Sequence, residues 1–201
     1  YETSNTVKNV GLFDLTAFSK FEIKSEKAHN ELQRICTANI KKEVGRCTYT
    51  QMLNSDGGIE TDLTVVCINE NHFRIFSSAA TRERDKFHIR KHLSEEIELI
   101  DITDKYCVFG LFGPKSRQLI KTISKDNFEN DNFKFGTAKY INIDGLKIWA
   151  QRLSYVGELG YELYVDFKDA KKIYDLLIDK GKNFNLSNCG MHALDIMRME
   201  S

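Results

Sequence analysis

The sequence predicts an α+β fold built on antiparallel or mixed sheets. Runs typical of strands are interleaved with amphipathic helical segments along all 201 residues. Two turn clusters, residues 54–58 and Asp144-Gly145, join strand-like runs directly and therefore predict hairpins. Regular strand–helix–strand punctuation is missing, which argues against a doubly wound parallel sheet.

The elements expected in the first half of the chain follow from hydrophobic periodicity. Strand patterns occupy residues 21–24, 48–53, 62–68, 73–76, 97–102 and 106–111, and helical patterns occupy residues 26–35 and 81–93. The mixed-sign run at residues 82–86 is expected to form the solvated face of the second of these helices.

The second half begins with Gly113-Pro114, which predicts a helix over residues 115–123 because proline is favoured in a first turn. The polar residues 127–132 predict a surface loop. Strands are expected at residues 139–143, 146–153 and 161–167, and helices at 168–180 and 191–201.

Composition limits the possible functions. Lys and Arg number 29, and Asp and Glu also number 29, so the chain lacks the positive field that non-specific nucleic-acid binding requires. No apolar run approaches the roughly 20 residues of a membrane span. The five cysteines contain no CxxC spacing and indicate a reducing compartment, the cytoplasm or a mitochondrial matrix. We expect a soluble globular protein without nucleic-acid or membrane partners. Because the chain starts at Tyr1 and stops within a helical pattern, we expect a segment of a longer protein.

The first candidate site is the segment GGIETDLTV at residues 57–65. Its glycines let the backbone adopt positive φ and approach a ligand closely. Asp62 opens an otherwise apolar strand, where a carboxylate is costly unless it is paired or used. The competing interpretation is a plain hairpin with a solvent-facing aspartate.

The second candidate site is SYVGELGYE at residues 154–162, with two glycines, two tyrosines and two glutamates. A carboxylate such as Glu158 or Glu162 can bind an N–C–N edge through two parallel hydrogen bonds. A glycine-rich loop with solvated acids is the alternative.

Other chemistry is not supported by the sequence. His88 and His92 stand four residues apart on an expected helix, a spacing that can hold a metal, but no third ligand accompanies them. A solvated helix face is favoured, and no metal site is predicted. No HExxH, Walker loop or GxGxxG motif is present. The cysteines are expected to be buried as small apolar residues.

Five ordered motifs resemble those of the glycine-cleavage T-protein (aminomethyltransferase) superfamily. They are GLFDLT at 11–16, YTQMLN with GGIETDLTV within 49–65, FGPKSR at 112–117, SYVGELGYELYV at 154–165 and ALDIMRME at 193–200. The forms SYVGELG and GGIETDLTV are most similar to the folate-binding region of dimethylglycine and sarcosine dehydrogenases.

The resemblance implies a tetrahydrofolate-binding enzyme that captures the carbon of an oxidised N-methyl amine as 5,10-methylenetetrahydrofolate. FAD would belong to an N-terminal domain outside these residues, which contain no flavin fingerprint. Two alternatives remain. One is a stand-alone aminomethyltransferase of the glycine cleavage system that uses an aminomethyl donor on a lipoyl carrier protein, and the other is a folate-binding module without catalysis.

The resemblance also implies roles for individual residues. Asp62 stands at the family's essential aspartate, where a carboxylate can accept a proton from a folate nitrogen and stabilise positive charge. Glu162 matches the glutamate that pairs with the 2-amino and N3–H edge of the pterin. Tyr155 and Tyr49 match aromatic positions of the folate site.

Two further residues of the expected folate site are Glu158, within the same signature, and Arg198. Leu194 stands where many T-proteins have an arginine, so Arg198 is expected to take over the contact with the folate. The family architecture implies two α+β units, residues 1–45 with 135–201 and residues 46–134, without the family's C-terminal barrel.

Overall fold

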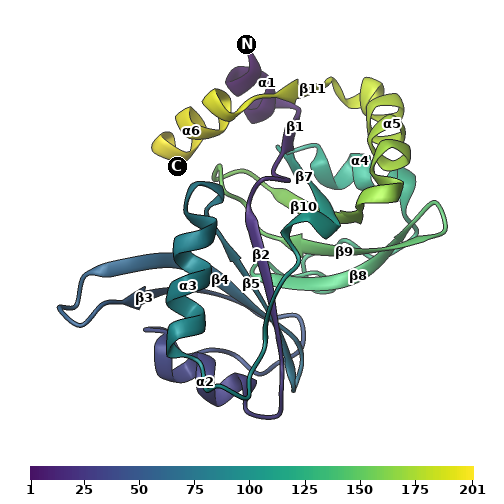
Figure 1. Cartoon of the computed structure of the whole chain (residues 1–201). Helices are drawn as coiled ribbons and strands as arrows, with labels where there is room; N and C mark the ends of the chain where they lie inside the picture. The colour runs from purple at the N-terminus through teal and green to yellow at the C-terminus, as the bar shows by residue number, and fades with distance from the viewer. The chain divides into compact units, whose positions relative to one another are not determined.

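The computed structural model describes all residues, 1–201, and contains two separate sheets (Figure 1). The chain divides into two compact units, Tyr1–Thr16 with Asp104–Ser201, and Ala17–Thr103. These boundaries differ from the expected ones, 1–45 with 135–201 and 46–134. Strand pairing explains the difference, because Phe21 pairs within the second unit and Phe109 pairs within the first.

The first unit contains a six-stranded sheet. Its elements are α1 (Glu2–Lys8), β1 (Val10–Asp14), β7 (Tyr106–Phe112), α4 (Ser116–Ile123), β8 (Thr137–Ile143), β9 (Leu146–Arg152), β10 (Gly160–Asp166), α5 (Ala170–Gly181), β11 (Leu186–Cys189) and α6 (Met191–Glu200). The strand order is β11-β1-β7-β10-β9-β8, and only the β1–β11 pair is parallel. The expected mixed sheet is confirmed.

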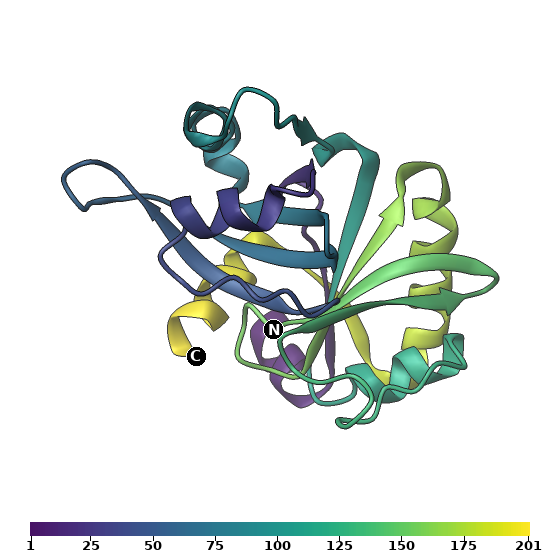
Figure 2. The ribbon, with the colours of Figure 1, turned by 90° about the horizontal axis from the view of Figure 1, so that it is seen from below.

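One face of this sheet forms the core of the first unit. Leu111, Leu163 and Ala150 lie on it and pack in one cluster with Leu119 of α4 and Ile173 of α5. Figure 2 shows α4 and α5 beside the green strands of this sheet. Because side chains alternate along a strand, the neighbouring positions project from the opposite face, which is free of these helices.

The second unit contains a five-stranded antiparallel sheet. Its elements are β2 (Ser19–Lys24), α2 (Ala28–Ile35), β3 (Cys47–Leu53), β4 (Ile59–Asn69), β5 (His72–Ser77), α3 (Arg82–His92) and β6 (Leu99–Asp101). The strand order is β3-β4-β5-β2-β6. The strand expected over residues 97–102 is only three residues long, since it pairs with β2 at Leu99–Asp101 alone.

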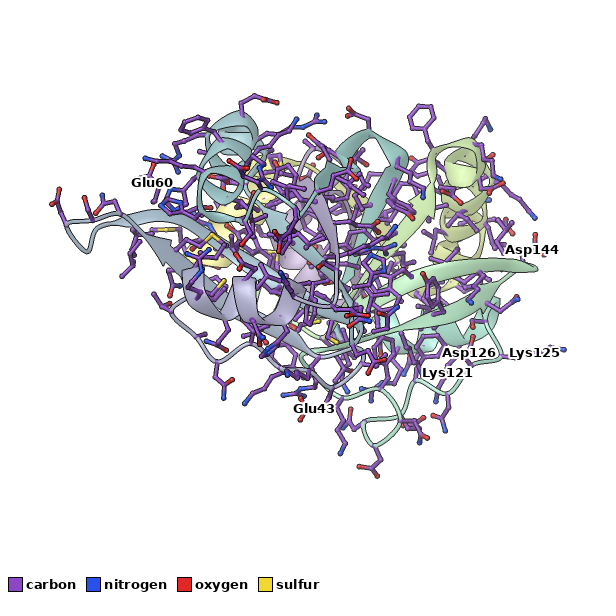
Figure 3. All side chains as sticks on the ribbon, turned by 60° about the horizontal axis from the view of Figure 1, so that its bottom comes forward. Glu43, Glu60, Lys121, Lys125, Asp126 and Asp144 are labelled. Atoms are coloured by element: carbon purple, nitrogen blue, oxygen red, sulfur yellow. The ribbon has the colours of Figure 1, made fainter.

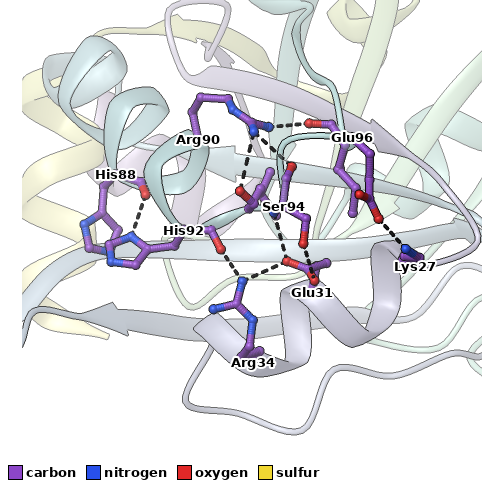
Figure 4. Close-up of polar contacts among 10 residues, drawn as sticks. Lys27, Glu31, Arg34, His88, Arg90, His92, Ser94 and Glu96 are labelled. Carbon is purple, nitrogen blue, oxygen red and sulfur yellow. Dashed lines mark hydrogen bonds and ion pairs between the residues drawn. The ribbon is translucent and has the colours of Figure 1, made fainter.

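The second unit buries the face of its sheet that α2 and α3 cover (Figure 1). Phe21 and Ile75 from the strands pack with Leu32 of α2 and Ile89 of α3. Polar contacts also join the two helices through the segment after α3 (Figure 4). Glu31 accepts hydrogen bonds from the backbone N–H and the hydroxyl of Ser94, at 3.2 and 2.9 Å.

Both expected hairpins are present. At the first turn, the Asn54 side chain accepts hydrogen bonds from the N–H groups of Asp56 and Gly58, at 3.0 and 2.9 Å. At the second turn, Asp144 and Gly145 have φ values of 50° and 82°, as a tight two-residue hairpin requires. The sequence pattern therefore determined these local connections.

Two elements at the edge of the first unit were not expected. Helix α1 is polar and buries only Thr6, so it has no apolar stripe to indicate it. Strand β11 has the sequence LSNC and forms by parallel pairing with β1, for example Leu12 with Asn188. Such pairing depends on a partner distant in sequence. None of the helices combines the length and apolar composition needed to cross a membrane.

Candidate functional site

Asp62 and Tyr49 meet on the sheet face of the second unit that lies away from α2 and α3. Tyr49 pairs with Thr64 and Gln51 pairs with Asp62, so these side chains share one face of the β3–β4 hairpin. The Tyr49 hydroxyl donates a hydrogen bond of 2.5 Å to Asp62 Oδ2. Both residues are exposed, with 63% of Tyr49 accessible. The arrangement leaves Asp62 as a hydrogen-bonded carboxylate that a ligand can reach.

Glu162 lies on the face of the first unit's sheet that is opposite α4 and α5. It lies on β10 between Gly110 of β7 and Gln151 of β9. Tyr164, two residues further along the same face, donates a hydrogen bond of 2.7 Å to Glu162 Oε2. Burial raises the pKa of Glu162 above its ordinary value of 4.5, and the Tyr164 hydrogen bond offsets part of that rise. This carboxylate is short of donors, because the structure gives Oε1 none.

Tyr155 and Arg198 are also brought together in the first unit. The Arg198 guanidinium carbon lies 5.8 Å from the centre of the Tyr155 ring, which is a cation–π contact. The loop that carries Tyr155 reaches the end of α6, since a Cβ added at Gly157 would lie 2.7 Å from the Ser201 side chain. Gly157 has a φ of +75°, which also favours glycine.

The remaining expected folate residues have less defined surroundings. Glu158 is half-buried in the loop before β10, and the structure gives its carboxylate no partner. Leu194 is fully buried on α6, so its side chain serves packing. Arg198, one turn later, is exposed, and its Nη2 lies 3.8 Å from Asp195 Oδ1.

The two histidines on α3 contact each other and the helix backbone. His92 Nδ1 lies 2.8 Å from the carbonyl oxygen of His88, and the imidazole rings are 4.5 Å apart (Figure 4). Burial and the neighbouring His92 lower the pKa of His88. The structure places no three His, Cys, Asp or Glu side chains together in a group that could hold a metal ion.

A cavity of about 500 Å³ lies elsewhere in the first unit, at the turn between β8 and β9. Lys125, Asp126 and Asp144 line it, and Figure 3 shows them at this end of the hairpin. None of the predicted site residues contributes to its lining. The cavity is therefore separate from the predicted folate-site residues of the first unit.

The structure also shows two polar residues that sequence reasoning missed. Gln151 is fully buried and neither atom of its amide has a hydrogen-bond partner, and the Ser154 hydroxyl is likewise buried without one. A buried glutamine in a strand indicates a site residue only when the residue opposite it on the neighbouring strand is known. The seven residues between β9 and β10 conceal that register from the sequence, whereas the Asp144-Gly145 turn reveals the β8–β9 register.

The fold defines the class of protein. The solved structure of the glycine cleavage system aminomethyltransferase T from Bartonella henselae superposes with a TM-score of 0.85 at 21% identity, over 99% of this chain and 53% of that chain. The two-unit α+β fold is thus that of the aminomethyltransferase T-proteins. The chain belongs to the GCVT N-terminal domain family, because the sequence model of that family matches it over residues 1–201.

Two relatives show the range of this family. An aminomethyltransferase from Halothermothrix orenii is 31% identical over 204 residues, which cover 99% of this chain and 56% of the relative. The mitochondrial dimethylglycine dehydrogenase of Rattus norvegicus is 30% identical over 202 residues, covering 99% of this chain and 24% of that protein. The chain therefore spans about half the length of the first relative and a quarter of the second. The family resemblance of the five motifs is confirmed.

Proposed function

We propose that this chain binds tetrahydrofolate and that the whole protein transfers a one-carbon unit to it. The observation that supports the proposal is the Glu162 carboxylate, which is half-buried and has an oxygen without a donor. A half-buried carboxylate with such an oxygen favours a ligand that supplies N–H groups. A ring with an amino group beside a ring N–H, as in the pterin of folate, supplies two donors in the required parallel arrangement.

The remaining roles are those that the family resemblance implies, and the contacts of the chain's own side chains support them. Glu162 would bind and orient the ring, and Tyr155 with Arg198 would offer an aromatic face and a positive charge. Bound tetrahydrofolate would supply the nitrogen atoms that take up the carbon. Asp62 would accept a proton from a reacting nitrogen and stabilise positive charge, with Tyr49 holding its carboxylate in place.

The replacement Glu162→Gln is expected to weaken tetrahydrofolate binding by about 10- to 100-fold, as the loss of hydrogen bonds to a charged acceptor predicts. Calorimetric titration of the whole protein measures the effect. Because burial raises the Glu162 pKa, the ligand-free variant should be no less stable than the wild type at neutral pH. Equal affinities of the variant and the wild type would contradict the pterin assignment.

The pH dependence of binding provides the control for this variant. Burial raises the Glu162 pKa above 4.5, and only the ionised carboxylate accepts two N–H bonds. Affinity in the wild type should therefore fall as the pH falls through that raised pKa, with the loss beginning above the pH at which an ordinary glutamate titrates. In Glu162→Gln this part of the profile should disappear.

For the carbon donor we infer an oxidised N-methyl amine, with capture of the carbon as 5,10-methylenetetrahydrofolate. The motif forms SYVGELG and GGIETDLTV support this inference, as does the 30% identity to a dimethylglycine dehydrogenase. FAD would then be held by residues outside this chain. The 31% identity to an aminomethyltransferase favours the second candidate, an aminomethyl donor on a lipoyl carrier protein.

A donor comparison on the whole protein separates these two functions. With tetrahydrofolate present, the first predicts that N-methylglycine or N,N-dimethylglycine oxidation yields 5,10-methylenetetrahydrofolate and leaves little free formaldehyde. The second predicts product only with an aminomethylated lipoyl protein. Folate binding without product from either donor would leave a binding module without catalysis.

A further inference from the structure

Gln151 is the direct neighbour of Glu162 across the β9–β10 ladder. The two residues pair in register, so their side chains project from the same face of the sheet, opposite α4 and α5. Directly opposed residues of antiparallel strands have Cβ atoms about 5 Å apart. The amide of Gln151 and the carboxylate of Glu162 therefore stand close enough to contact adjacent atoms of one small ring.

The surroundings on the other side of Glu162 are apolar and closely packed. Phe112 lies over the two glycines nearest to it, because a Cβ added at Gly110 or Gly160 would come within 2.8 or 2.2 Å of the Phe112 ring. Gly160 and Gly110 both neighbour Glu162, along β10 and across β7 respectively. Polar contacts beside Glu162 are thus available on the Gln151 side and blocked on the Phe112 side.

The amide of Gln151 is an unusual feature of this face. The residue is fully buried, yet neither Nε2 nor Oε1 has a hydrogen-bond partner. A buried amide without partners destabilises a folded protein, and buried polar groups are nearly always satisfied. An apolar side chain of similar shape would pack at this position without that cost. The presence of the amide is therefore explained if a ligand provides its partner.

We propose that Gln151 and Glu162 together recognise a 2-amino-4-oxo nitrogen heterocycle. Glu162 accepts hydrogen bonds from the amino group and the ring N–H, and Gln151 Nε2 donates to the ring carbonyl next to that N–H. The inference rests on the proposed folate function and extends it, since it makes Gln151 the residue that distinguishes a 4-oxo ring from a 4-amino ring.

The first test is the replacement Gln151→Met, which keeps the length of the side chain and removes the amide. Tetrahydrofolate affinity, measured by calorimetry on the whole protein, should fall about tenfold, as expected for one or two lost hydrogen bonds. The Tm of the ligand-free protein should stay constant or rise by about 2–4 °C, because an unsatisfied amide is removed. A residue needed only for folding would show a lower Tm.

Gln33 offers a matched control. Its amide donates to the Ala38 carbonyl at 3.1 Å and accepts from the Ile40 N–H at 2.9 Å, so it is satisfied within the second unit. Gln33→Met should lower the Tm and leave tetrahydrofolate affinity unchanged. If Gln151→Met lowers the Tm as Gln33→Met does, or binds tetrahydrofolate like the wild type, the recognition role of Gln151 is overturned.

The second variant, Gln151→Glu, leaves only hydrogen-bond acceptors at this position, whereas the wild-type amide can both donate and accept. A second carboxylate repels the ring carbonyl and accepts from a 4-amino group. The ratio of affinities for a 2,4-diamino analogue over tetrahydrofolate should rise at least about tenfold above the wild-type ratio. An unchanged ratio overturns the inference. Failure of the wild type to bind tetrahydrofolate, or of Glu162→Gln to weaken binding, overturns the proposed function instead.

Discussion

The replacement Asp62→Asn is expected to slow one-carbon transfer by about two to four orders of magnitude while leaving tetrahydrofolate affinity nearly unchanged. General acid–base groups contribute rate factors of this size. Asparagine retains the shape and can still accept the Tyr49 hydroxyl, but it cannot take up a proton or carry negative charge. The measurement is the rate of 5,10-methylenetetrahydrofolate formation by the whole protein at saturating folate. A smaller kcat with a constant folate Kd would assign Asp62 to the chemical step.

Two variants serve as controls for that experiment. Tyr49→Phe removes the 2.5 Å hydrogen bond to Asp62 and should reduce kcat only about tenfold, since the carboxylate itself remains. Asp56 is an exposed aspartate of the same hairpin turn, and Asp56→Asn should retain wild-type turnover. Unchanged turnover in Asp62→Asn would exclude its role as the base.

The largest expected loss of stability comes from Arg74→Met in the second unit. Arg74 Nε lies 2.7 Å from Glu22 Oε1 across the β2–β5 pair, and both side chains are only 6% exposed. Removing Arg74 leaves the buried carboxylate with only Lys24 and His72 beside it, so we expect a cost of about 3 kcal/mol, at the lower end of the range for a broken buried pair. Urea denaturation at pH 7 measures the difference in the free energy of unfolding.

The double variant Glu22→Leu with Arg74→Met should regain most of that loss, because no unpaired charge remains. Lys171→Met, which breaks the exposed pair with Asp175, should change stability by no more than the experimental error. A small effect of Arg74→Met on its own would show that water or another group replaces the guanidinium.

Lowering the pH should reduce the free energy of unfolding of the wild type, because it protonates Glu22 of this pair. Burial alone raises the Glu22 pKa, but contacts with His72, Lys24 and Arg74 outweigh burial and hold that pKa well below 4.5. A carboxyl group whose pKa is lowered by folding stabilises the folded protein at pH values above its unfolded pKa. This stabilisation is lost as the pH falls from the unfolded pKa towards the folded one. The Glu22→Leu, Arg74→Met double variant should lack this part of the acid dependence.

The helices and hairpins could be predicted well because their signals are local. The Asp144-Gly145 turn and the Asn54–Gly58 turn specify hairpins within a few residues, and α5 carries its apolar stripe on a single helix. The assignment of strands to units could not be predicted in the same way. Residues 19–24 join the second unit because Phe21 pairs with Ile75 and Asp101, both far away in the sequence.

For the candidate site, the acids and aromatics could be recognised from motif positions alone: Asp62, Glu162, Tyr49 and Tyr155. The groups that surround each of these side chains could be identified only from the folded chain. Cross-strand pairing brings Tyr49 to Asp62 and places the unsatisfied Gln151 amide beside Glu162. The physical reason is that register determines which side chains share a sheet face, and register between strands joined by a long loop is set by the packing of the whole unit.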